Sequence, residues 1–82
     1  LSMVATVSGQ DIAVSLTPSG TYGTDWDHIG ISIDGGTVEM LASNVTQKNF
    51  TSTTVGDHKI VAFLMDSSHQ KLSEDKMILV TV

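Results

Sequence analysis

The side chains best suited to bind a ligand fall in two short stretches that lie far apart in the sequence. The first contains Asp25, Asp27 and His28, and the second contains Asp66 and His69. Carboxylates are the ligands that Ca²⁺ uses, together with backbone carbonyls, whereas two imidazoles favour Zn²⁺ or Cu²⁺. These five residues are the candidate metal ligands. A structural alternative stays open, in which Asp66 and His69 hydrogen-bond the backbone of their own loop.

Two aromatic residues lie in or just before the first of these stretches. They are Tyr22 and Trp26, the only Tyr and the only Trp of the chain. Exposed aromatic rings on loops of β proteins stack on sugar rings. With His28 and His69, they form a candidate carbohydrate site. The alternative, which we favour for Trp26, is a place in the hydrophobic core, where a small domain usually buries its one Trp.

The remaining histidine, His58, follows a Gly56-Asp57 turn signal and begins a long apolar run. We expect it at the other end of its strand from Asp66 and His69. Its predicted role is structural.

Composition limits the class of protein. The chain has 82 residues, which favours a single domain over residues 1–82. A net charge of −5 with four basic residues argues against a nucleic-acid partner. No stretch approaches the roughly 20 apolar residues of a membrane span. The chain has no Cys, no Gly-x-Ser-x-Gly elbow and no glycine-rich phosphate loop, so we expect no enzymatic activity.

Alternating apolar residues predict strands in every part of the chain. The clearest case is Ile29, Ile31 and Ile33, which alternate with small or polar residues before the hairpin signal Asp34-Gly35. The predicted strands cover residues 3–8, 11–17, 29–34, 37–42, 48–54, 58–65 and 76–82. Seven short strands separated by turn residues favour a two-sheet antiparallel sandwich. A barrel of five or six strands is the alternative.

The alternation also predicts which side chains face inward. The strands at 58–65 and 76–82 are apolar on both faces. The outer face around Gly30, beside Phe63, is either an apolar docking patch or is covered by long side chains such as Lys59 and Lys76. The predicted core consists of Val14, Leu16, Trp26, Ile29, Ile31, Ile33, Phe50, Ile60, Ala62, Leu64 and Leu79.

The sandwich is what brings the candidate ligands together. If the third and sixth strands pair antiparallel, the start of the third lies beside the end of the sixth. Asp25, Asp27 and His28 then approach Asp66 and His69 at one end of the domain.

The sequence shows two resemblances to known domains. Residues 55–66 (VGDHKIVAFLMD) resemble the sixth strand of fibronectin type III and bacterial immunoglobulin-like domains, which have a Gly-containing turn, a Tyr or His entering the strand and then alternating apolar residues. Residues 27–35, 56–58 and 64–72 together resemble Ig-like accessory modules of secreted bacterial proteins. Met65 departs from the usual Val, and Asp27 stands where Gly often precedes the His.

The resemblance implies a seven-stranded antiparallel immunoglobulin-like (fibronectin type III-like) β-sandwich. It also implies a non-catalytic accessory, spacer or interaction module of an exported multidomain bacterial protein, secreted or at the cell surface. The partners would be neighbouring domains of the same chain. The alternative function is a module that binds carbohydrate or a metal ion, Ca²⁺ or Zn²⁺, through the loop end around Trp26, His28 and His69.

Overall fold

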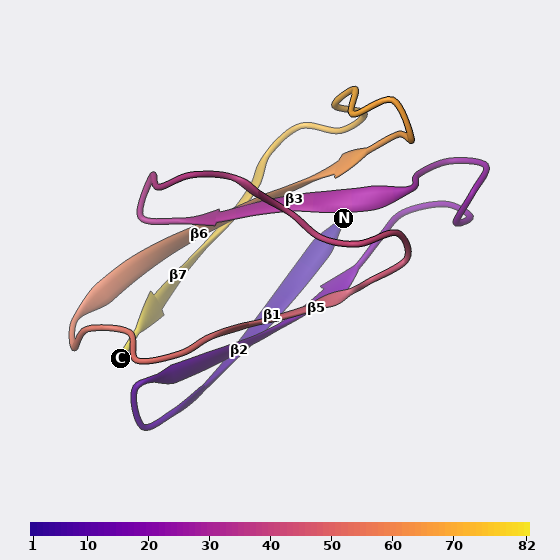
Figure 1. Ribbon diagram of the computed structural model, residues 1–82. Helices are drawn as coiled ribbons and strands as arrows, with labels where there is room; N and C mark the ends of the chain where they lie inside the picture. The colour runs from indigo at the N-terminus through magenta and orange to yellow at the C-terminus, as the bar shows by residue number, and fades with distance from the viewer.

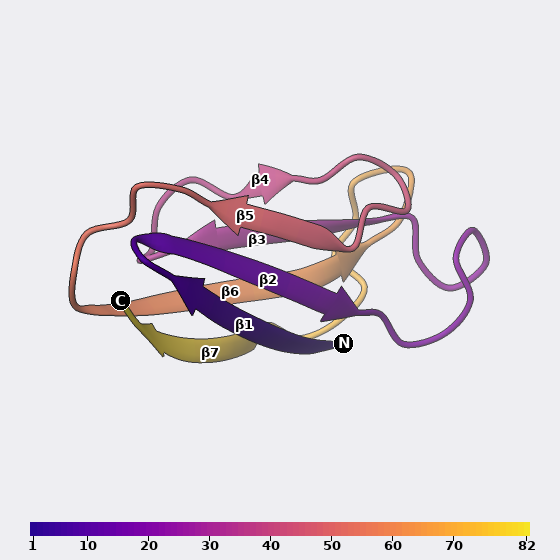
Figure 2. The ribbon, with the colours of Figure 1, turned by 90° about the horizontal axis from the view of Figure 1, so that it is seen from below.

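The computed structural model describes all 82 residues as an all-β domain of two antiparallel sheets (Figure 1). The smaller sheet has the order β1-β2-β5 and the larger has the order β4-β3-β6-β7. The two sheets are separate, so the structure is a two-layer arrangement and not a closed barrel. Figure 2 shows β1, β2 and β5 on one side of the layer formed by β3 and β6. The strands are β1 (Ser2–Ser8), β2 (Asp11–Thr17), β3 (His28–Ile33), β4 (Glu39–Met40), β5 (Gln47–Phe50), β6 (Asp57–Met65) and β7 (Lys76–Thr81).

The core lies between the sheets and follows the alternation of the strands. In β2, the side chains of Ile12, Val14 and Leu16 are buried, while the residues between them are exposed. Because one face of each sheet packs on the other sheet, a period of two separates inner from outer residues. The buried cluster has eleven members: Ile12, Val14, Leu16, Trp26, Ile29, Ile31, Leu41, Ile60, Ala62, Leu64 and Val80.

Most of the predicted core is confirmed, and Leu79 is a correction. Ile33 and Phe50 are partly buried against the cluster, but Leu79 is 74% exposed. The register pairs Leu79 with Lys59 on the outer face of the larger sheet, whereas Val80 pairs with the buried His58. β7 is an edge strand with one face on the core, so only one of its two apolar faces can be buried.

The outer face of the larger sheet is partly covered by its own side chains. The Phe63 ring lies directly over Gly30, where an added Cβ would be 2.7 Å from Cζ of Phe63. The Nζ of Lys71 lies 4.8 Å from the centroid of the Phe63 ring, at a distance suited to a cation–π contact. Lys71, which the sequence did not single out, is therefore one of the long side chains that cover this face.

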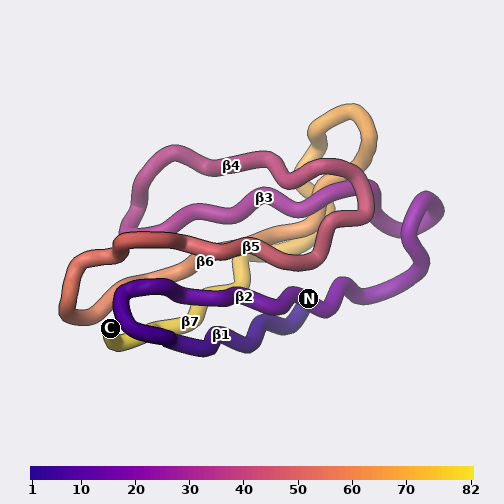
Figure 3. The backbone as a smooth tube through the Cα atoms, turned by 60° about the horizontal axis from the view of Figure 1, so that its bottom comes forward, coloured from indigo at the N-terminus to yellow at the C-terminus, as the bar shows by residue number.

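The sandwich has two distinct ends, which we name after their histidines. At the His28 end, β3 begins and β6 ends, and at the His58 end, β3 ends and β6 begins. The loop of residues 18–27 connects the two sheets and projects from the His28 end (Figure 3). The structure contains no helix long and apolar enough to cross a membrane.

The exposure of Leu79 leads to a test by paired truncations. Replacing the fully buried Ile60 with Ala should cost about 2–5 kcal/mol of unfolding free energy, because it removes buried methyl groups and leaves a cavity. Leu79→Ala should change it by less than about 0.5 kcal/mol, as for an ordinary surface substitution. Urea unfolding of both variants measures the difference. A comparable loss from the two would contradict the orientation of β7 described here.

Candidate functional site

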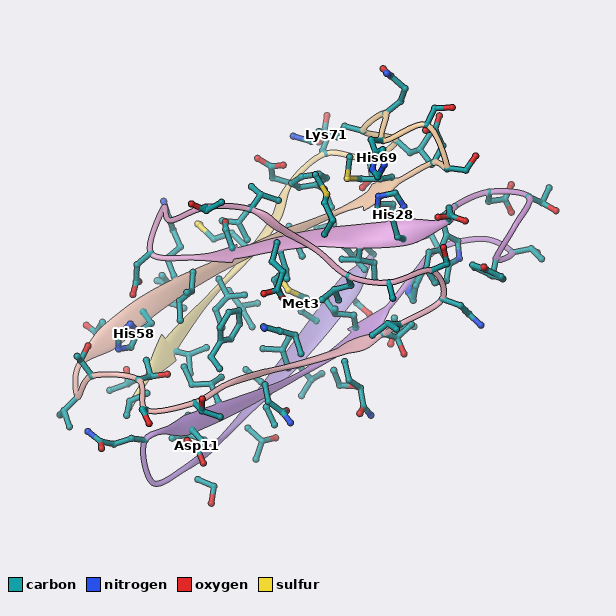
Figure 4. All side chains as sticks on the ribbon, in the orientation of Figure 1. Met3, Asp11, His28, His58, His69 and Lys71 are labelled. Carbon is teal, nitrogen blue, oxygen red and sulfur yellow. The ribbon has the colours of Figure 1, made fainter.

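The His28 end brings together three of the predicted site residues. β3 and β6 pair antiparallel with His28 opposite Met65, so the start of β3 lies beside the loop that follows β6. Figure 4 shows the rings of His28 and His69 next to each other at this end, with His58 at the other. The centroids of the two rings are 4.9 Å apart, and their planes meet at 71°.

A chain of hydrogen bonds links Ser43, Asp27, His28 and His69. The Oδ2 atom of Asp27 accepts from Nδ1 of His28 at 2.9 Å and from Oγ of Ser43 at 3.0 Å. The hydrogen bond from His28, followed by that from Ser43, lowers the pKa of Asp27. Because the carboxylate only accepts, the proton of a neutral His28 ring is on Nδ1. Its Nε2 then accepts from Nδ1 of His69, 3.2 Å away.

The two members of the pair differ in burial. His28 is 4% exposed, in line with its place at the start of a central strand, whereas His69 is exposed on the loop that follows β6. A surface depression of about 430 Å³ opens beside both rings and is bounded also by Ser43, Ser67 and Met40. A ligand that reaches His69 from solvent would therefore also reach the buried ring of His28.

Asp25 and Asp66 do not join this cluster. The Oδ2 of Asp25 accepts from the backbone N–H of Thr21 at 2.6 Å, within its own loop. The Oδ1 of Asp66 accepts from the backbone N–H groups of Ser68 and Gln70, each at 2.9 Å. Asp66 thus has the structural role that we kept as the alternative. No group of three or more His, Cys, Asp or Glu side chains is arranged to hold a metal ion, so the predicted five-residue ligand set is not assembled.

The aromatic residues of the predicted carbohydrate site also separate. Trp26 is 5% exposed and belongs to the core, as we favoured, so its face is closed to a sugar. Tyr22 is 42% exposed and packs edge-on against Trp26, with 5.2 Å between the ring centroids. Tyr22 therefore offers the only exposed ring of the pair.

Ser43 is a member of the site that sequence reasoning did not find. It lies between β4 and β5, in a segment without any pattern that would link it to Asp27. The backbone hydrogen bond from Asn44 N to Asp27 O, 3.0 Å long, brings this segment to the start of β3. The contact of Ser43 with Asp27 therefore depends on tertiary structure, and the spacing of residues in the sequence could not have predicted it.

His58 lies at the opposite end, as predicted, and both of its ring nitrogens are engaged. Nδ1 lies 2.5 Å from Oδ2 of Asp34, and Nε2 lies 2.6 Å from the backbone oxygen of Thr54. Both partners accept only, so the ring donates twice and is the imidazolium form. The hydrogen bond to Asp34 and then that to Thr54 raise the pKa of His58. The hydrogen bond from His58, followed by that from the backbone N–H of Lys59, lowers the pKa of Asp34.

Comparison with known proteins yields a structural similarity without a sequence family. No family model matches the sequence. No curated protein matches it either. Among solved structures, the spore cortex lytic enzyme SleM of Clostridium perfringens is similar, with a TM-score of 0.76 and 16% sequence identity. The match covers 98% of this chain, but this chain spans only about a quarter (26%) of that enzyme's chain. At this identity, the similarity concerns the fold alone.

The doubly bonded His58 predicts a pH-dependent contribution to stability. A raised folded-state pKa means that the contribution is fully present below the unfolded value of about 6.5. It is lost as the pH rises through the folded-state pKa. The difference in unfolding free energy between the parent chain and His58→Gln should therefore shrink from pH 6 to higher pH.

Urea unfolding of both chains at a series of pH values tests this. His28 and His69 are present in both chains, so any contribution from them cancels in the difference. Asp34 stays ionised throughout, because its pKa is lowered. A difference that is constant or that grows with pH would show that His58 is not held as the imidazolium.

Proposed function

We propose that this chain is a non-catalytic accessory module with an immunoglobulin-like, fibronectin type III-like fold. In this proposal, it positions neighbouring domains in an exported multidomain bacterial protein. The observation that carries the proposal is the structural match in which nearly all of this chain corresponds to about a quarter of a lytic enzyme. A fold of this kind thus occurs as one part of a longer bacterial chain.

The strand order supports the fibronectin type III-like variant. In constant-type immunoglobulin domains, the fourth strand belongs to the sheet of the first two strands. Here β4 pairs with β3 in the other sheet, with Gly30 opposite Met40. Seven antiparallel strands divided three and four, with this placement of β4, agree with the resemblance of residues 55–66.

The positions of the chain ends support a spacer role. The N-terminal amine of Leu1 lies 2.8 Å from Oγ of Ser19, near the end of β2 and the His28 end. Val82 exchanges two backbone hydrogen bonds with Gly56, directly before β6 at the His58 end. The domain measures 38 Å along its longest axis and about half of that across. Domains joined before and after it would therefore leave from different ends of the sandwich.

The spacer role can be measured by energy transfer between labelled ends. The chain has no Cys, so Ser2→Cys and Thr81→Cys provide two unique and exposed attachment points. We expect one narrow distribution of dye separation, set by the fixed positions of the two ends in the folded domain and lost in denaturant. A broad distribution under native conditions would contradict a rigid spacer.

Binding of carbohydrate through the His28 end is the second candidate. It is favoured by the exposed ring of Tyr22 and by a polar depression of about 340 Å³ at the base of the same loop, bounded by Asp25, Asp66 and Ser67. The exposed ring could stack on one sugar ring, and the polar groups beside it could bind the sugar hydroxyls.

Retention on insoluble polysaccharides and on a glycan array separates the two candidates. For a spacer, we expect no retention above that of an unrelated β domain. Retention that Tyr22→Ala removes, and that the exposed control Leu79→Ala leaves intact, would replace the spacer by a carbohydrate-binding module.

A further inference from the structure

We propose that His28 and His69 form a binding site for a divalent transition-metal ion, Zn²⁺ or Cu²⁺, at the His28 end. The ion would lie between Nε2 of His28 and Nδ1 of His69. This inference goes beyond the accessory role, because it rests on the geometry of the two rings and holds for a spacer and for a carbohydrate-binding module alike.

The separation of the two nitrogens fits a shared metal ion. Each imidazole nitrogen lies about 2.05 Å from a bound Zn²⁺, so two of them at a tetrahedral angle are about 3.3 Å apart. In the structure, Nε2 of His28 and Nδ1 of His69 are 3.2 Å apart. The rings therefore need small rotations to aim both lone pairs at one ion, and the backbone can stay where it is.

The ring of His28 is already oriented as a metal ligand. Its Nδ1–H donates to the carboxylate of Asp27, and this leaves the lone pair on Nε2. A carboxylate behind a ligating histidine fixes the tautomer and raises the basicity of the ligating nitrogen. Ser43 in turn holds Asp27 in place. Asp27 and Ser43 are thus positioning residues, and neither contacts the ion.

The ring of His69 is held by the loop of residues 66–70. Asp66 accepts two backbone hydrogen bonds within this loop, and His69 N donates to Asp66 O at 3.1 Å. His69 has a φ of 63°, in the left-handed region that non-glycine residues seldom occupy. The second ligand is therefore placed before any ion arrives, which reduces the entropy lost on binding.

Binding requires only a shift of one proton. In the neutral pair, Nδ1–H of His69 donates to Nε2 of His28. When an ion takes both nitrogens, this proton moves to Nε2 of His69, whose side chain is exposed. The net charge of the two rings is unchanged, and the ion replaces a single hydrogen bond.

The same geometry disfavours Ca²⁺. A calcium site needs six to eight oxygen ligands, but Asp25 and Asp66 are engaged with the backbone of their own loops. The other coordination positions of a transition-metal ion would face the open depression beside Ser43 and Ser67, where water is available. With two protein ligands, this would be an open site.

The test is a metal titration of the chain, produced without a polyhistidine tag. We expect saturable binding of one Zn²⁺ by calorimetry and no binding of Ca²⁺. In nuclear magnetic resonance spectra, the imidazole signals of His28 and His69 should move together, while those of His58 should not.

Three variants assign the site. His69→Asn removes one ligand and keeps a residue that accepts positive φ, so it should fold and bind Zn²⁺ at least tenfold more weakly. Asp27→Asn should weaken binding by about 10–100-fold, as expected for a group behind a metal ligand. His58→Gln is the matched control and should leave the affinity unchanged. The proposal is wrong if Zn²⁺ does not bind saturably, if His69→Asn binds as the parent does, or if only the removal of His58 weakens binding.

Discussion

The antiparallel pairing of β3 with β6 is the constraint on which the rest of the structure depends. Its register places His28 opposite Met65 at one end and Ile33 opposite Ile60 at the other. A shift of one residue would turn Ile29 and Ile31 out of the core, because side chains alternate between the faces of a strand. The hydrophobic core therefore sets the register, and the register sets which polar residues meet at each end.

The two ends use histidine in opposite ways. At the His58 end, a carboxylate and a carbonyl saturate both ring nitrogens, and the charged ring connects the turn after β3 to the segment before β6. At the His28 end, one imidazole is presented to another, and a carboxylate behind the pair sets the tautomer. A ring with both nitrogens committed can only stabilise the fold. A ring whose second nitrogen only accepts a hydrogen bond from another imidazole can give up that bond and bind an ion instead.

The similarity to part of a lytic enzyme concerns the fold and not the two ends. At 16% identity, the shared property is the arrangement of two sheets around a core, and many functions occur on such sandwiches. Any activity specific to this chain must come from its ends and loops, where residues are free of the core. The projecting loop of Tyr22 and the histidine pair both lie at the His28 end, so that end is where a ligand would be recognised.

What the sequence determined by itself was the periodic part of the molecule. The seven strands were predictable, and so was the buried face of β2 and of the central strand β3. Burial of one face requires strict alternation, as in Ile12, Val14 and Leu16 or in Ile29 and Ile31. The sequence also predicted that His28 and His69 are neighbours and that His58 lies at the opposite end of the domain.

Only the tertiary structure decided the rest. β7 is apolar on both faces, so its pattern could not choose between Leu79 and Val80, and the choice came from the register with β6. Asp25 and Asp66 have the same chemistry as Asp27, but each is nearer to backbone N–H groups of its own loop than to the histidines. Hydrogen bonds in loops depend on distances of a few tenths of an ångström between segments far apart in the chain, and no periodicity in the sequence records those distances.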